Sequence, residues 1–346
     1  MLQDPISSEP TPVPQRRRTG RVLASLLVGA CVLAGSYYAY DQRYTISNWI
    51  QTQQFEPSAE VATLEEHLQL TTAGSLVFRS THPEIIDRDR FNKACAGVDH
   101  REGGHVVGCY SHKHAIYLFR VNDSRISGIV ETTAAHELLH AAWAQLKNGE
   151  RESLQQQLLS FYEERKAADP ALAERMSVYE HLSETSFANE LHSVLGTEVS
   201  DLPKTLETHY SSYFKDRGAI LSYFNGYHSV FSDLQAEAEQ LQANMDGIKS
   251  EYESRRASFE DAVRSFNADA EAFRKRNDEH FYADDPAAFY RESDLLKQRR
   301  DSLENERLQL EGLASDFETK RQRLLELSET SVDLNRKLDS SLDPLH

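Results

Sequence analysis

The first strong pattern in the chain is an apolar run near its amino terminus. Residues 22–40 carry no charged side chain, and a helix of that length would span about 28 Å, close to the hydrocarbon thickness of a bilayer. Arginines precede the run and tyrosines lie at its far end: Arg16, Arg17, Arg18 and Arg21, then Tyr37, Tyr38 and Tyr40. We therefore expect a single-pass membrane protein, with a disordered cytoplasmic tail at residues 1–21 and a transmembrane helix at 22–40 in the lipid bilayer. The rest of the chain is then expected outside the cytoplasm, in a periplasm or at a cell surface. A cleaved signal peptide and lipidation at Cys31 are the alternatives.

Helical and strand-like patterns alternate over the next part of the chain. A linker is expected at residues 41–57, and apolar positions at helical spacing then predict a helix around Val61 and Leu68. Short apolar runs predict three strands, and further periodic segments predict helices: strands at 75–79, 106–110 and 115–121, and helices at 87–94, 125–147, 151–166, 170–182, 184–196 and 203–215. This mixture predicts an α+β domain over residues 58–215, with a small sheet and several helices.

A heptad pattern replaces this texture from about residue 216. A break falls at residues 277–286. After it, apolar side chains recur at every seventh position: Leu296, Leu303, Leu310, Phe317 and Leu324. The pattern predicts two long helices over residues 216–342. Heptads serve both intramolecular and intermolecular pairing. An α-helical hairpin within the chain and a coiled coil with a partner, or with a second copy, therefore both remain open.

Composition narrows the possible partners. The chain has 55 Asp and Glu against 38 Lys and Arg, a net charge of -17, which disfavours nucleic acid because phosphates would be repelled. Cys95 and Cys109 flank a short glycine-containing stretch. A disulfide between them would contribute about 3 kcal/mol in the chain-entropy model. Two unpaired thiols are the alternative.

The segment His136–His140, with the sequence HELLH, carries the main candidate chemistry. Residues four apart lie on one face of a helix, so His136 and His140 can present both imidazoles to one metal ion. Two imidazoles, a carboxylate and an open position for water suit zinc, which lowers the pKa of that water. Glu137 lies beside the same face and is the candidate general base. An amphipathic helix with two incidental histidines is the alternative.

The order of these elements resembles the zincin metallopeptidases, and the segment Asn189-Glu190-Leu191-His192-Ser193-Val194 is similar to the Asn-Glu-x-x-Ser-Asp pattern of their thermolysin-like gluzincins. The resemblance covers about residues 58–215. It implies that Glu190 is the third zinc ligand and that Ser193 can hydrogen-bond a ligand. Val194 departs from the pattern, which has Asp there, so the role of that Asp is unassigned. The metzincin pattern HExxHxxGxxH is absent after His140.

Other residues compete for or complete this site. Glu184, on the same expected helix, is the rival to Glu190 as third ligand, although one helix face cannot offer both residues. The resemblance also implies an oxyanion donor on a later helix, for which His209 and Tyr210 are candidates. An ordinary aromatic packing pair is an equal alternative.

The sequence thus predicts a membrane-anchored, gluzincin-like zinc endopeptidase that hydrolyses peptide or protein substrates outside the cytoplasm. Substrate is expected to pair with the strand at 115–121 through main-chain hydrogen bonds. The alternative is a coiled-coil scaffold or assembly protein that carries a structural or inactive zinc module.

Overall fold

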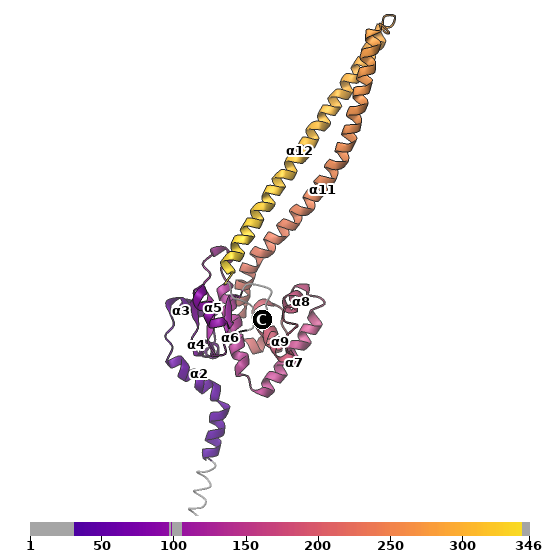
Figure 1. The fold of residues 1–346 in the computed structure, drawn as a ribbon. Coiled ribbons are helices and arrows are strands. Elements are labelled where there is room, and N and C mark those ends of the chain that lie inside the picture. Colours follow the sequence, from indigo (N-terminus) through magenta and orange to yellow (C-terminus); the bar gives the residue numbers. More distant parts are fainter. Residues whose placement is uncertain (1–30, 97, 99–105, 341–346) are drawn as a thin grey trace, which may run out of the picture.

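A computed structural model describes residues 31–96, 98 and 106–340, which form a globular part and a long two-helix arm (Figure 1). Helices make up 77% of the structure. The helices are α2 (Arg43–Gln53), α3 (Ala59–Leu68), α4 (Thr72–Ser80), α5 (Arg88–Cys95), η1 (Ser124–Ile126), α6 (Ile129–Gln145), α7 (Asn148–Arg165), α8 (Pro170–Ser177), α9 (Glu184–Glu198), α10 (Lys204–Tyr210), α11 (Arg217–Asp278) and α12 (Pro286–Leu338). The strands are β1 (Glu84–Ile86), β2 (Gly108–Tyr110) and β3 (Ile116–Phe119). The α+β prediction was therefore wrong, because the sheet formed by the described residues has only these three short strands.

The amino-terminal prediction also needs correction. Among the residues that the structure describes, no helix combines the length and the apolar character that crossing a bilayer requires. Residues 22–30 of the expected transmembrane segment, like the tail at 1–21, lie outside the described part. The expected linker at 41–57 is largely helix α2. Its Asn48 side chain donates a 2.7 Å hydrogen bond to Gln145 at the end of α6, so α2 packs on the globular part.

The sheet places β3 in the centre, with β1 parallel to it on one side and β2 antiparallel on the other. The strands expected at 106–110 and 115–121 are confirmed as β2 and β3. The strand expected at 75–79 was wrong, because those residues belong to α4. The Thr71 hydroxyl accepts a hydrogen bond from the Gly74 amide and caps that helix. Helical winding then buries Val77 and Phe78.

Helix α6 is the centre of the globular part. It contacts β2 and β3 on one side and α9 on another, and its middle is buried through Ala134, Ala135, Leu138 and Leu139. The helix expected at 125–147 starts later, because Gly128 has a left-handed backbone (φ 99°) that separates η1 from α6. The other helices predicted between 87 and 215 are confirmed as α5 and α7–α10, with shifted ends.

Helix α9 approaches α6 closely at Gly196. A Cβ atom at this position would overlap the Leu139 side chain and would lie 2.7 Å from the Tyr210 ring. Only glycine lets the two helices meet at this distance. This packing sets the position of α9, and therefore of Glu190, relative to the histidines of α6.

The arm is an antiparallel hairpin of α11 and α12 within one chain (Figure 1). Helix α11 ends at Asp278 and α12 begins at Pro286, as the predicted break requires. The base of the arm is part of the globular packing, since Leu334 and Leu338 of α12 share a buried cluster with Phe91 of α5 and Cys109 of β2. The arm is thus continuous with the core rather than a separate module.

Candidate metal centre

Helices α6 and α9 bring three metal-ligating side chains together. One ligand atom from each of His136, His140 and Glu190 lies within 4.8 Å of the others. The two histidines lie one turn apart on α6, as their spacing predicts, and Glu190 faces them from α9. All three side chains are largely buried, with exposures of 12%, 11% and 17%.

The distances between these donors fit a zinc ion. Glu190 Oε2 lies 3.6 Å from His136 Nε2 and 3.4 Å from His140 Nε2. Ligands at the usual zinc distances in a tetrahedron are separated by about 3.3 Å, so one ion can reach all three atoms. In addition, Glu190 Oε2 is buried and makes no hydrogen bond, although both imidazoles are its ion-pair partners. A cation between these donors would satisfy a buried carboxylate oxygen that lacks a hydrogen bond.

The metal-free site is an ion pair. Burial of His140 disfavours its charged form, but the Glu190 carboxylate outweighs burial and raises the pKa of His140 to about 10. Burial of Glu190 acts in the opposite direction to the two histidines, which together hold the pKa of its carboxyl well below its usual range. Each charge is therefore stabilised by the other in a water-poor environment.

The carboxylate of Glu137 lies beside strand β2. A Cβ atom at Gly108 would overlap Thr133 and would lie 3.2 Å from Glu137 Oε1, so this strand passes close to α6 only because residue 108 is glycine. Glu137 and His136 line a cavity of about 110 Å³ that Arg175 of α8 and Tyr227 of α11 also line. The candidate general base therefore opens onto a space next to the ligands.

Ser193 lies one turn after Glu190 on α9, and its hydroxyl is 3.3 Å from His140 Nδ1. The structure thus places a hydrogen-bonding group behind one candidate ligand. The Nε2 atom of that ring is the one nearest Glu190, so the two ring nitrogens face different partners. A partner on Nδ1 fixes the orientation of a ligating imidazole.

Two predicted oxyanion donors have other partners. Tyr210 is completely buried, and its hydroxyl donates a 2.7 Å hydrogen bond to the carbonyl oxygen of His192. His209 Nε2 lies 2.8 Å from His192 Nε2. Both side chains therefore belong to a packed group around His192, which is itself fully buried against Trp143. In this arrangement neither side chain belongs to the group of three candidate ligands, and the packing pair that the sequence left open describes their contacts.

The remaining predicted residues fall outside the ligand group. Glu184 is exposed at the start of α9 and accepts a 2.7 Å hydrogen bond from Gln155, so it does not join the histidines. Cys95 and Cys109 form a disulfide that ties the end of α5 to β2. Through Cys109 this bond holds the same strand that carries Gly108 past Glu137.

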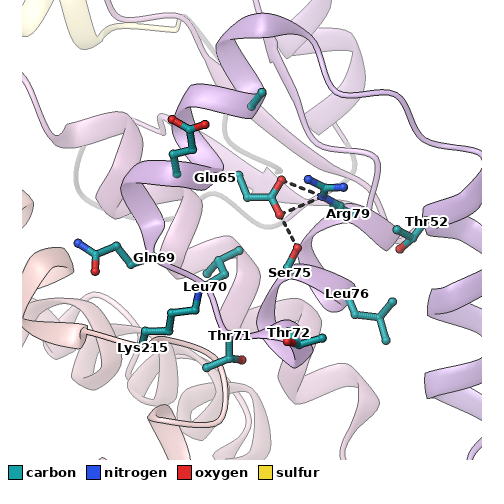
Figure 2. Close-up of a pocket in the computed structure, with 12 residues that line it drawn as sticks. Thr52, Glu65, Gln69, Leu70, Thr71, Thr72, Ser75, Leu76, Arg79 and Lys215 are labelled. Atoms are coloured by element: carbon teal, nitrogen blue, oxygen red, sulfur yellow. Dashed lines mark hydrogen bonds and ion pairs between the residues drawn. The ribbon is translucent and has the colours of Figure 1, made fainter.

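Another cavity, of about 730 Å³, lies between α3 and α4 and shares no lining residue with the metal centre (Figure 2). Its central carboxylate is already bound. Arg79 Nε lies 2.9 Å from both oxygens of Glu65, and the Ser75 hydroxyl donates to the same group. This volume is therefore not where the candidate chemistry converges.

Sequence inspection missed part of the cavity beside Glu137. Arg175 and Tyr227 come from α8 and α11, and Glu198 at the end of α9 binds Arg175. These residues show no motif or spacing that relates them to the HELLH segment. Their only signal is the fold itself, which brings residues of α8, α9 and α11 to a cavity that α6 also lines.

Comparison of the chain with family models, with curated proteins and with solved structures gives no match. The resemblance to gluzincins therefore depends on the ligand residues and their geometry alone.

Proposed function

We propose that this protein is a zinc-dependent peptide hydrolase with its reaction centre between α6 and α9. The observation that carries the proposal is the convergence of His136, His140 and Glu190 at separations that suit one tetrahedral ion. Three protein donors leave a fourth position open, which is typical of catalytic zinc sites, whereas structural sites have four protein donors. The described residues supply three donors in this group.

The chemistry follows from the residues around the ligands. A bound zinc ion would act as a Lewis acid and would make an attacking water more acidic. Glu137 accepts a proton from that water at its carboxylate and returns it to the leaving amine. His136 and His140 would bind the ion as neutral imidazoles, and Ser193 holds the ring of His140 in place.

The substrate strand is expected on β2 rather than on the strand predicted from the sequence. Strand β3 is central and is paired on both sides, so it cannot accept another strand. In the described residues β2 pairs with β3 alone, and Gly108 of β2 lies against Glu137. A peptide added to the outer edge of β2 would pass beside the candidate base.

The test compares the full-length wild-type protein with the Glu137→Gln variant after zinc loading. We expect about one bound zinc per chain in both proteins, and cleavage of peptides by the wild type alone, because Gln cannot accept the proton. Zinc content is measured by elemental analysis, and cleavage of a broad peptide mixture by mass spectrometry. Zinc in both proteins with cleavage by neither would reject the hydrolase and favour a structural zinc module beneath a helical scaffold.

We also propose that the domain works in an oxidising compartment. The Cys95–Cys109 disulfide supports this, because such bonds persist outside the reducing cytosol. Alkylation of thiols before and after reduction, in protein taken directly from its native cells, tests it. Labelling of both cysteines without prior reduction would contradict it.

A further inference from the structure

A third cavity, of about 390 Å³, opens on α6 just beyond the candidate ligands. Ala144 lines it, and Ala144 continues the helix face of His136 and His140 because it follows His140 by four residues. The cavity therefore begins about 6 Å along the helix axis from His140. Its other walls come from α2, the end of α4 and the turn between β2 and β3.

Strand β2 borders both this cavity and the candidate base. Gly108 faces Glu137, and alternate residues of a strand share a face, so Tyr110 lies on the same side of β2 as Gly108. Tyr110 lines the cavity of about 390 Å³. Cys109, which lies between Gly108 and Tyr110 in the strand, points to the other face and packs in the buried cluster that contains Phe91. An extended peptide paired with β2 advances about 6.6 Å in two residues. In such a peptide, a side chain two positions from the residue opposite Gly108 would lie beside Tyr110 and this cavity.

The cavity is lined by basic and hydrogen-bonding side chains. Lys113, His82 and His114 are its ionisable basic residues, and none of the described residues that line it is Asp or Glu. This composition contrasts with a chain that has 55 acidic against 38 basic residues. A cavity of this kind attracts an anion and repels a cation.

The Tyr110–His114 pair supplies a hydrogen-bond donor for that anion. The Tyr110 hydroxyl lies 2.6 Å from His114 Nδ1. Burial, with Tyr44 nearby, raises the pKa of Tyr110 to about 12, so its hydroxyl keeps its proton at neutral pH. In one tautomer of His114 the hydroxyl donates to Nδ1, which leaves the hydrogen on Nε2 for a ligand. In the other tautomer Nδ1 donates to the hydroxyl oxygen, which leaves the hydroxyl hydrogen for a ligand.

We propose that this cavity is a subsite for a substrate carboxylate, carried by an acidic side chain two residues before the bond that is cleaved. The proposal rests on the hydrolase function proposed above. Antiparallel pairing with β2 sets the direction, because such a peptide runs from Tyr110 toward Gly108. Lys113 provides the charge that selects Glu or Asp over the neutral amides.

The experiment uses full-length, zinc-loaded protein and a peptide that the wild type cleaves at one mapped bond. Two versions of the peptide carry either Glu or Gln at the second residue before that bond. Two further versions carry Gln at this position and end two residues after the bond, one in a free carboxylate and the other in an amide. The second pair tests whether the protein recognises a terminal carboxylate. We expect cleavage of the Glu peptide to exceed that of the Gln peptide by about tenfold in kcat/KM. Lys113→Glu should abolish or reverse this ratio. Lys215→Glu, an equal charge change at the cavity of Figure 2, should preserve it.

A binding measurement separates this proposal from the hydrolase function. Fluorescence anisotropy with Glu137→Gln protein and labelled Glu and Gln peptides reports the preference without cleavage. Selective binding of Glu peptides that requires Lys113, with no cleavage by the wild type, would keep the subsite and reject the hydrolase. Equal cleavage of Glu and Gln peptides, or a preference that survives Lys113→Glu, would overturn the subsite. A preference for the terminal carboxylate alone would also overturn it.

Discussion

The globular part and the helical arm are stabilised in different ways. In the globular part, helices far apart in sequence meet through completely buried side chains such as Leu138, Leu139 and Leu191. In the arm most side chains are exposed, and the well-buried ones form a narrow seam that includes Met245, Leu310 and Leu327. Exposed ion pairs within one helix surround that seam, and each contributes little.

This difference determines which region should be more sensitive to a substitution. The seam of the arm repeats the same type of apolar contact between α11 and α12 along its length. A single substitution there should therefore change the packing only near that position. The candidate metal centre depends on the distance between α6 and α9, which many residues set together. The same substitution should therefore act differently in the two regions.

The largest expected effect comes from Glu190→Ala. It removes a ligand and leaves the charge of His140 without its main partner, so we expect zinc affinity to fall by more than about 100-fold. Glu184→Ala on the same helix loses only an exposed hydrogen bond to Gln155 and should retain zinc. Competition with a fluorescent chelator measures both. Retention of zinc by Glu190→Ala would remove this residue from the site.

Zinc binding should depend steeply on pH. Burial lowers the pKa of His140, but the charge of Glu190 outweighs burial and raises this pKa from 6.5 to about 10 in the absence of metal. The raised pKa contributes stability that is fully present below pH 6.5 and is lost as the pH rises through about 10. The lowered pKa of Glu190 contributes stability that is present above 4.5 and is lost as the pH falls below it.

Zinc needs a neutral imidazole, so binding at pH 7 must displace the His140 proton. Affinity should rise by about tenfold per pH unit, or about 100-fold between pH 6 and 8. Calorimetry in buffers with different ionisation heats should show close to one proton released per zinc. The arm should keep its helicity over this range, which circular dichroism measures. Equal heats in all buffers would mean that His140 is already neutral.

A matched pair of glycines tests the contrast directly. Gly196→Ala places a Cβ atom against Leu139 and Tyr210, so we expect a loss of about 1–3 kcal/mol in the free energy of unfolding and weaker zinc binding. Gly312 of α12 is exposed with no atom within 4 Å of its Cβ position. Gly312→Ala should stabilise the arm by about 0.5–1 kcal/mol. Urea titrations of both variants measure the change in the free energy of unfolding. Equal changes in the two variants would contradict the distinction between the regions.

The smallest effect is expected from Ser193→Ala. The variant loses the 3.3 Å contact with His140 Nδ1 but no ligand, so zinc affinity should fall by about tenfold. Ser193→Thr keeps a hydroxyl and should recover part of the loss. An unchanged affinity in Ser193→Ala would show that other packing already fixes the ring of His140.

The sequence carried the local part of the site. His136, Glu137 and His140 were identifiable because four-residue spacing on a helix is a short-range relation. Glu190 came from a short segment that resembles a known pattern. The two long helices were equally predictable from the sequence, because the heptad pattern directly indicates which side chains form the apolar seam.

The rest depended on contacts between distant segments. The segment 75–79 is a short apolar run that suits a strand or a helix, and the Thr71 cap decides for a helix. The edge position of β2 depends on how three strands pair, which their sequences do not state. Tyr210 could not be assigned because its orientation is set by His192 and Gly196.

The length of α11 has a mechanical consequence. This helix has 62 residues, and its first turns lie near the candidate site, with Tyr223 beside Gly128 and Tyr227 in the wall of the cavity near Glu137. At the helical rise it is about 93 Å long, so moving its far end sideways by about 10 Å would tilt a rigid rod by about 6°. Tyr227, about 15 Å from the start of the helix, would then shift by about 1.6 Å. A rigid arm that pivoted at the start of α11 would therefore reduce displacement about sixfold and multiply force by the same factor at the wall beside the candidate base.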